Sequence, residues 1–352
     1  MGRGIAASFC KTVLTAGTVV AGLVAAATRP SYAQASADMA WDMALYGVPR
    51  SVMKVADEVS RQVEVVTQGK FKIRTHYGAG LAPEKEILDG LSIGAFQIGW
   101  VVVGYAPGKL LGVTGLDLPF LPVSNLEALQ KVRYDYLAQP EVANDFTRWG
   151  TVVLLPAPLP FFEFMGKGKG LASVADFSGK RLRVLGGLGD GLRLIGAAPT
   201  SFTSPELYPA LERGVLDGLA IPYSVLAAYK IHEISTWYTK GLTITPPIAV
   251  LAMNLKAYES LAPQYRKALH DVGPSSIEAQ MKAVEADEIK AEEMFLQRGI
   301  QKIVFPPAEF QKLAERAGRP IWDKWVQDVT SKGYPGQRLL DVILTSAKKA
   351  NS

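Results

Sequence analysis

The sequence has a single cysteine, Cys10, among 352 residues. Cys10 lies in an N-terminal segment with the composition of a secretory signal peptide, so the mature chain is expected to have no thiol. This excludes disulfides, cysteine metal ligands and a cysteine nucleophile from the mature protein. Cys10 also precedes the apolar part of the segment, which is a poor position for lipid attachment.

The only long hydrophobic run covers residues 12–28. Arg3 and Lys11 precede it, and Ser31-Tyr32-Ala33 follows it with small residues at the −3 and −1 positions of a cleavage site. A membrane span is the alternative, but the run is shorter than the roughly 20 residues that a span needs. We therefore predict that residues 1–33 are a cleaved signal peptide and that the protein is exported to the periplasm.

The expected mature chain also carries little net positive charge. The signal segment holds three cations and no acid, so its removal lowers the formal charge from +5 to +2. A nucleic-acid-binding function thereby loses its main support. Histidine occurs at three distant positions, His76, His232 and His270, without the spacing of a zinc motif. No G-x-S-x-G serine-hydrolase motif is present, and no pair of carboxylates stands out as that of a glycosidase.

Roughly 320 residues remain, enough for two lobes with substantial cores. The first part alternates between strand and helix patterns, which predicts an α/β fold with a mainly parallel, helix-covered sheet. Val52, Val55, Val59, Val63 and Val66 recur at three- and four-residue spacing and predict one buried helix face. Further on, the pattern predicts short strands at residues 181–185 and 198–202, a long helix at 278–297, and terminal helices with Trp322 and Trp325 one turn apart.

A glycine-rich turn, residues 186–191, follows the predicted strand 181–185. Its context is that of a dinucleotide-binding fingerprint, but the third glycine falls two places after the second instead of three. A tight strand-to-helix turn explains it equally, and export makes a nicotinamide cofactor improbable. Downstream, Ser204-Pro205 predicts an N-cap with proline in the first helical position.

Arg183 stands near the end of this predicted strand, just before the turn. A strand-end arginine often pairs with a structural acid, and it can equally bind a ligand carboxylate through two charge-assisted hydrogen bonds. Glu163 is unusual because it lies among large apolar residues in Phe161-Phe-Glu-Phe-Met165. It either faces water by alternation along a strand, or faces a ligand cleft where it could pair with Arg183.

These residues together resemble the extracytoplasmic substrate-binding proteins of TRAP transporters, the C4-dicarboxylate-binding-like family. The resemblance runs over essentially the whole mature chain. It includes Thr67-Gln-Gly69-Lys-Phe-Lys-Ile73, Tyr77-Gly-Ala-Gly-Leu81 with the following Glu84, and Leu118-Pro-Phe120. Its most specific part comprises Asp176, Gly179, Arg183, Gly196-Ala-x-Pro199-Thr200, Glu206-Leu-Tyr208 and Asp217-Gly218.

The resemblance implies a two-lobed periplasmic-binding-protein (Venus-flytrap) α/β fold with a long helix spanning both lobes. It places lobe I at residues 38–158 plus 247–288 and lobe II at 159–246 plus 289–352, approximately. It implies a solute receptor rather than an enzyme, with a small organic acid as ligand and TRAP membrane subunits as partners. We expect no cofactor; the residues show no metal motif, and a metal ion that bridges protein and ligand stays open. In the family, the arginine that matches Arg183 pairs with the substrate carboxylate.

Several positions depart from the sialic-acid-binding branch of the family. Val102 stands near the place of an acid, Ile221 replaces an asparagine before Pro222, and Glu163 aligns near a second arginine. Apolar residues there suit a less hydroxylated ligand, namely a monocarboxylate with an apolar or aromatic body, or a small oxo or hydroxy acid. The residues expected to bind it are Arg183, Trp100, Val102, Glu84, Glu163, Ser204, Ile221 and Tyr223.

Two other functions remain open on the residues alone. One is a receptor for another transport class or a signalling sensor, and the other is a secreted α/β hydrolase or dehydrogenase acting on a small acid. The enzyme would need a nucleophile–base pair or a cofactor cradle, and the sequence shows neither convincingly.

Overall fold

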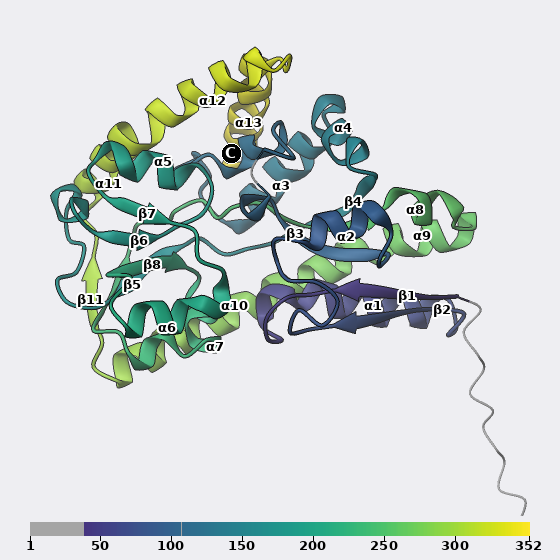
Figure 1. Cartoon of the computed structure of the whole chain (residues 1–352), viewed down its shortest axis with the longest axis horizontal. Coiled ribbons are helices and arrows are strands. Elements are labelled where there is room, and N and C mark those ends of the chain that lie inside the picture. The colour runs from purple at the N-terminus through teal and green to yellow at the C-terminus, as the bar shows by residue number, and fades with distance from the viewer. Residues whose placement is uncertain (1–38, 107) are drawn as a thin grey trace, which may run out of the picture. The chain divides into compact units, whose positions relative to one another are not determined.

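The computed structural model describes residues 39–106 and 108–352, so the expected signal peptide lies outside the described residues. The described chain forms two β-sheets with helices packed around them (Figure 1). This confirms the predicted α/β fold. Within the described part of the chain, no helix has the length and apolar character needed to cross a membrane.

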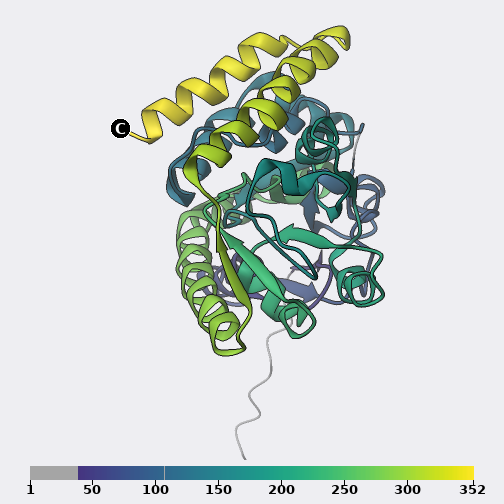
Figure 2. The ribbon, with the colours of Figure 1, turned by 90° about the vertical axis from the view of Figure 1, so that its left-hand side faces the viewer.

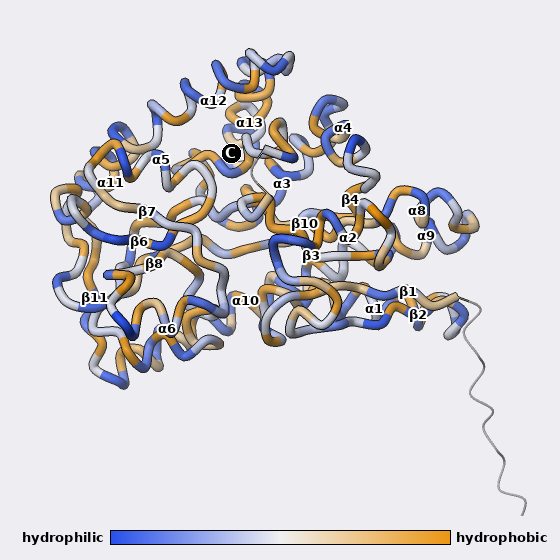
Figure 3. The backbone as a smooth tube through the Cα atoms, viewed as in Figure 1, coloured by the Kyte–Doolittle hydropathy of each residue, from blue (hydrophilic) through white to orange (hydrophobic). Residues whose placement is uncertain are grey.

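The first sheet has the strand order β2-β1-β3-β10-β4. Its strands are β1 (Met39–Ala44), β2 (Phe71–His76), β3 (Ile98–Val102), β4 (Thr151–Ala157) and β10 (Ala249–Asn254). β1 pairs in parallel with β2 and β3, whereas β10 runs antiparallel to β3 and β4. Every residue of β3 and β10 is buried, as expected for central strands covered on both faces. Figure 3 shows these two strands as mainly hydrophobic.

Four helices pack against strands of the first sheet. They are α1 (Lys54–Val66), α2 (Ile87–Ile93), α3 (Leu126–Leu137) and α4 (Pro140–Arg148). A single 3₁₀ turn, η1 (Ser51–Met53), precedes α1. The predicted valine face is buried at its first four positions, but Val66 is exposed. It lies in the last turn of α1, beside the exposed loop that leads to β2, where the helix no longer packs on the core.

The second sheet has the order β11-β9-β5-β8-β6-β7. Its strands are β5 (Glu163–Gly166), β6 (Arg181–Arg183), β7 (Ala198–Thr200), β8 (Gly218–Ile221), β9 (Trp237–Lys240) and β11 (Gln301–Val304). β6 is parallel to β7 and β8, while β5 is antiparallel to β8 and β9. The helices between these strands are α5 (Gly187–Leu194), α6 (Leu207–Glu212) and α7 (Tyr223–Ala228).

Two helical segments contact both halves of the described chain. After α8 (Leu255–Ser260) and α9 (Pro263–Asp271), the 25-residue helix α10 (Gly273–Gln297) packs against α1 and also against α7 (Figure 2). Near the C-terminus, α11 (Pro307–Leu313) leads through a π-helical turn at Ala314–Gly318 to α12 (Arg319–Ser331) and α13 (Gly336–Ala350). α12 contacts α5, whereas α13 packs on α3.

The glycine-rich turn serves close packing. α5 begins at Gly187, directly after Gly186, which adopts a φ of 63°. A Cβ on Gly191 would lie 1.8 Å from the carbonyl oxygen of Ala317, so only glycine lets α5 approach the π-helical turn this closely. The glycine at 191, which breaks the dinucleotide spacing, therefore has a structural reason.

Glu163 holds together the region where the chain crosses between the two sheets. It begins β5, and just before it Phe162 forms an antiparallel bridge with Ile244. Its Oε1 accepts hydrogen bonds from the amides of Gly241 (2.8 Å), Leu242 (2.9 Å) and Thr243 (3.1 Å), and its Oε2 accepts one from the Thr239 hydroxyl (2.7 Å). The carboxylate is thus buried and hydrogen-bonded to β9 and to the loop after it, rather than facing water.

We expect Glu163→Gln to lower the unfolding free energy by about 2–4 kcal/mol, because it removes a charged acceptor from several buried donors. Urea denaturation would measure this, with the exposed Glu293→Gln as control. We also expect ligand affinity to be unchanged by Glu163→Gln. Unaltered stability together with altered ligand preference would instead place this carboxylate in the ligand site.

Candidate ligand-binding site

Arg183 is the last residue of β6, and its side chain is almost completely buried, with 1% of its surface exposed. Its Nε donates a hydrogen bond to the carbonyl oxygen of Phe202 (2.8 Å), and its Nη1 to that of Ala220 (3.3 Å). Its Nη2 donates to the hydroxyl of Tyr105 (2.8 Å), which comes from the segment after β3. This last bond links the second sheet to the first.

All three acceptors of Arg183 are neutral. Within the described ranges, Arg183 forms no ion pair, and the carboxylate of Glu206 is instead held by the amide and hydroxyl of Thr203, each at 2.7 Å. Burying a cation without an opposite charge costs free energy, and a bound anion would offset that cost. Arg183 is therefore the residue best placed to bind a ligand carboxylate.

A cavity of about 40 Å³ lies beside Arg183, and we call it the Arg183 cavity. Four other residues predicted for the site also line it, namely Trp100, Val102, Ser204 and Ile221. Trp100, Val102 and Ile221 are buried and make the wall largely apolar. Ser204 is free to line the cavity because Thr203, one residue earlier than predicted, is the N-cap of the following 3₁₀ turn.

Three of the predicted site residues lie elsewhere. Glu163 and Tyr223 line a separate pocket of about 300 Å³, and the Tyr223 hydroxyl donates a hydrogen bond to the carbonyl oxygen of Thr239. Glu84 does not line the Arg183 cavity, although its buried Oε1 has no hydrogen-bond partner among the described residues.

The sequence reasoning missed several residues of the cavity, among them Tyr46, Arg50, Tyr105 and Leu185. A signal for them existed, because ligands of open α/β sheets bind at the carboxyl ends of the strands. Tyr46 and Arg50 follow the end of β1, Tyr105 follows β3, and Leu185 follows β6. The cavity is thus built where the carboxyl ends of strands from both sheets meet.

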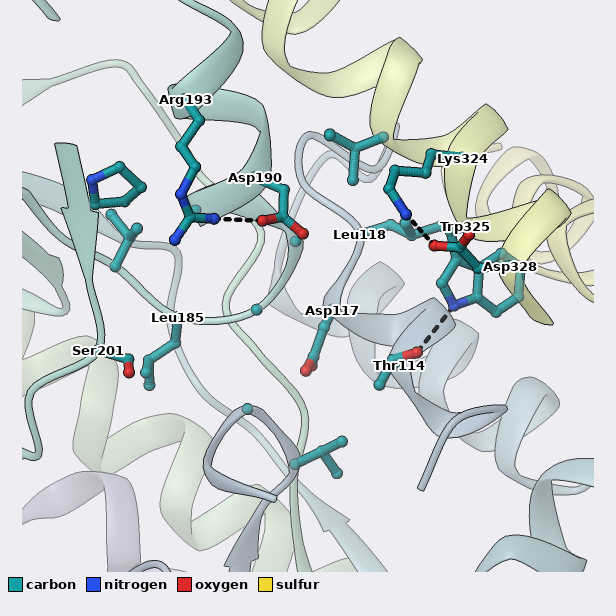
Figure 4. A pocket seen from close by; sticks show the side chains of 18 of the residues that line it. Thr114, Asp117, Leu118, Leu185, Asp190, Arg193, Ser201, Lys324, Trp325 and Asp328 are labelled. Carbon is teal, nitrogen blue, oxygen red and sulfur yellow. Dashed lines mark hydrogen bonds and ion pairs between the residues drawn. The ribbon is translucent and has the colours of Figure 1, made fainter. Parts of the chain in front are cut away.

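A larger pocket of about 560 Å³ lies next to the cavity, with Leu185 in the lining of both (Figure 4). We call it the Asp117 pocket. Its cations have acidic partners, because Arg193 pairs with Asp190 and Lys324 pairs with Asp328. This leaves no unpaired cation for a carboxylate among the residues described around it, so the Arg183 cavity is the better candidate despite its smaller volume.

A family model described as bacterial extracellular solute-binding protein, family 7, matches residues 49–328. The chain belongs to this family. The prediction of a TRAP-type solute-binding protein rather than an enzyme is thereby confirmed. Among the described residues of this binding protein, no group of three or more His, Cys, Asp or Glu side chains is placed to hold a metal ion.

Similar proteins support the same family. A solute-binding protein of Verminephrobacter eiseniae is 23% identical over 239 residues, which cover 66% of this chain and 70% of the relative. A TRAP solute-binding protein of Rhodoferax ferrireducens with copurified benzoate has a TM-score of 0.81 at 22% identity, covering 88% of this chain and 98% of that one. A sugar-acid-binding protein of Advenella mimigardefordensis with galactonate has a TM-score of 0.75 at 21% identity, covering 88% and 98%.

Asp117 of this binding protein is a buried acid at the contact between the two halves of the described chain. Its Oδ1 accepts a hydrogen bond from the amide of Ile248 (2.7 Å), and its backbone lies close to Gly186 and Gly187. Burial raises the pKa of Asp117 from its ordinary value of 3.8 to about 7, although the Ile248 amide and the charge of Arg133 act in the opposite direction.

Asp117→Asn is expected to raise the unfolding free energy relative to wild type, and this gain should be larger at pH 8 than at pH 4. The folded wild type holds a proton that the unfolded chain releases above pH 3.8, so this group lowers stability progressively as pH rises from about 4 to 7. Asparagine keeps the acceptor for Ile248 but cannot ionise. Urea unfolding at pH 4, 6 and 8 would test this, with the exposed Asp323→Asn as control, and a pH-independent difference from wild type would contradict it.

Proposed function

We propose that this protein is an extracytoplasmic receptor that binds a small organic carboxylate and delivers it to the membrane subunits of a TRAP transporter. The observation that carries the proposal is the buried guanidinium of Arg183, which has three neutral acceptors and lies beside a cavity. A carboxylate would supply the missing negative charge through short, charge-assisted hydrogen bonds.

The walls of the Arg183 cavity favour a ligand with few hydroxyl groups. Trp100, Val102 and Ile221 present apolar surface, and such surface would leave the hydroxyls of a sugar acid without partners. We therefore propose a monocarboxylate with an apolar or aromatic body, or a small oxo or hydroxy acid. The benzoate bound by the similar Rhodoferax ferrireducens protein is an acid of this kind.

Binding would act by stabilising a closed state. We propose two lobes, residues 38–158 plus 247–288 and residues 159–246 plus 289–352, which a ligand bridges by contacting both. A ligand with higher affinity for the closed form shifts the population toward it. The closed form would then present a composite surface to the membrane subunits, where an ion gradient would drive uptake. Export through a cleaved signal peptide at residues 1–33 would place the receptor in the periplasm.

Arg183→Gln is expected to weaken binding of a small carboxylate by about 100-fold or more, because it removes two charge-assisted hydrogen bonds. Isothermal titration with the preferred acid would measure the loss. The matched control is Arg181→Gln, two residues away on the same strand, where the arginine is exposed and pairs with Asp217. Affinity of the Arg183→Gln protein within threefold of wild type would remove Arg183 from the carboxylate site.

A thermal-shift series would test the ligand class. We expect benzoate or pyruvate to raise the melting temperature, because the protein binds them only when folded, and galactonate to have little effect. A larger shift with galactonate than with the less hydroxylated acids would contradict the proposed apolar site. Mass spectrometry of molecules released from the denatured protein would identify any copurified acid directly.

A further inference from the structure

A second cation, Arg50, lines the same cavity as Arg183. It follows β1 and is the residue just before the 3₁₀ turn that leads into α1, so it belongs to the first half of the described chain. Arg183 belongs to the second sheet. The cavity is therefore bordered by one guanidinium from each side.

Arg50 is held in place by its own neighbours. Its Nη1 donates hydrogen bonds to the carbonyl oxygens of Val48 (2.7 Å) and Tyr46 (3.3 Å). Its guanidinium carbon lies 5.2 Å from the centre of the Tyr46 ring and 5.5 Å from that of the Tyr229 ring, within the range of cation–π attraction. A guanidinium fixed in this way loses little conformational freedom when a ligand binds.

One buried donor of Arg50, its Nε, has no hydrogen-bond partner among the described residues. Arg50 also forms no ion pair within them. A buried donor without an acceptor is costly and rare in native proteins. Two carbonyl oxygens engage Nη1 and two aromatic rings lie beside the guanidinium, so its Nε–H edge suits an acceptor oxygen.

We propose that Arg50 donates a hydrogen bond to a second oxygen of the ligand, remote from the carboxylate bound by Arg183. Arg50 then selects acids that carry a hydroxyl, oxo or further carboxyl group over the same acids without it. This inference rests on the proposed function and names the residue that reads the other end of the ligand. It also explains how a mostly apolar cavity discriminates between acids of similar shape, since its polar groups are few and fixed.

Isothermal titration of the full mature protein at pH 7 tests this with two matched pairs: 3-hydroxybenzoate against benzoate, and pyruvate against propionate. In at least one pair, we expect wild type to prefer the acid with the extra oxygen by about tenfold or more. Arg50→Met keeps the apolar stem and removes every donor, so it should abolish this preference while the affinity for the simpler acid stays within threefold. Arg50→Lys keeps the charge but lacks the Nε–H and should also lose most of the preference.

Arg213→Met, at an exposed position outside the cavity, is the matched control and should leave both affinities unchanged. Circular dichroism checks that each variant is folded. If Arg50→Met does not fold, the result for Arg50→Lys decides the test. Equal weakening of both acids, or a preference that persists without Arg50, overturns the inference. If wild type binds both acids of each pair with equal affinity, the inference about Arg50 is also overturned, but the proposed function is not. A wild type that binds none of the four acids overturns the proposed ligand class as well.

Discussion

A buried guanidinium that has no carboxylate partner in the described part of the chain is the constraint on which the candidate site depends. The Arg183 side chain is buried at the end of β6, and its three hydrogen bonds go to two carbonyl oxygens and a tyrosine hydroxyl. Such an arrangement engages only part of the five N–H donors of the guanidinium and does not neutralise its charge. Binding of an anion beside Arg183 would offset the cost of this buried charge, and in the proposed function that anion is the ligand carboxylate.

The surrounding structure keeps other charges from competing for Arg183. Glu163, the acid considered from the sequence as a possible partner, accepts hydrogen bonds from Thr239 of β9 and from three amides of the loop after β9. The carboxylate of Glu206 accepts hydrogen bonds from the N-cap residue Thr203, and the cations of the neighbouring Asp117 pocket pair with acids of their own. Each of these carboxylates interacts with hydrogen-bond donors or cations other than Arg183. The Arg183 guanidinium is therefore available for a ligand.

The sequence predicted the elements well where the pattern is local. The valine spacing predicted α1, the turn glycines predicted the start of α5, and the spacing of Trp322 and Trp325 was found on α12. Local patterns carry less information where distant contacts decide the arrangement. The orientation of Glu163 depends on amides 78 to 80 residues away, and the exposure of Val66 depends on where α1 stops packing. Glu84 and Tyr223 were expected in the site on resemblance, but neither lines the Arg183 cavity.

By itself, the sequence determined the family and the α/β class, because these follow from short motifs, periodicity and their order along the chain, and it singled out Arg183 as a candidate. Only the tertiary structure decided that Arg183 has no acidic partner within residues 39–106 and 108–352, and that Arg50 lines the same cavity. Arg50 and Arg183 lie on segments far apart in the chain, and the Tyr105 hydroxyl that contacts Arg183 comes from 78 residues away. Pairing and burial of charges are set by which strand ends meet in space, and no local pattern encodes that.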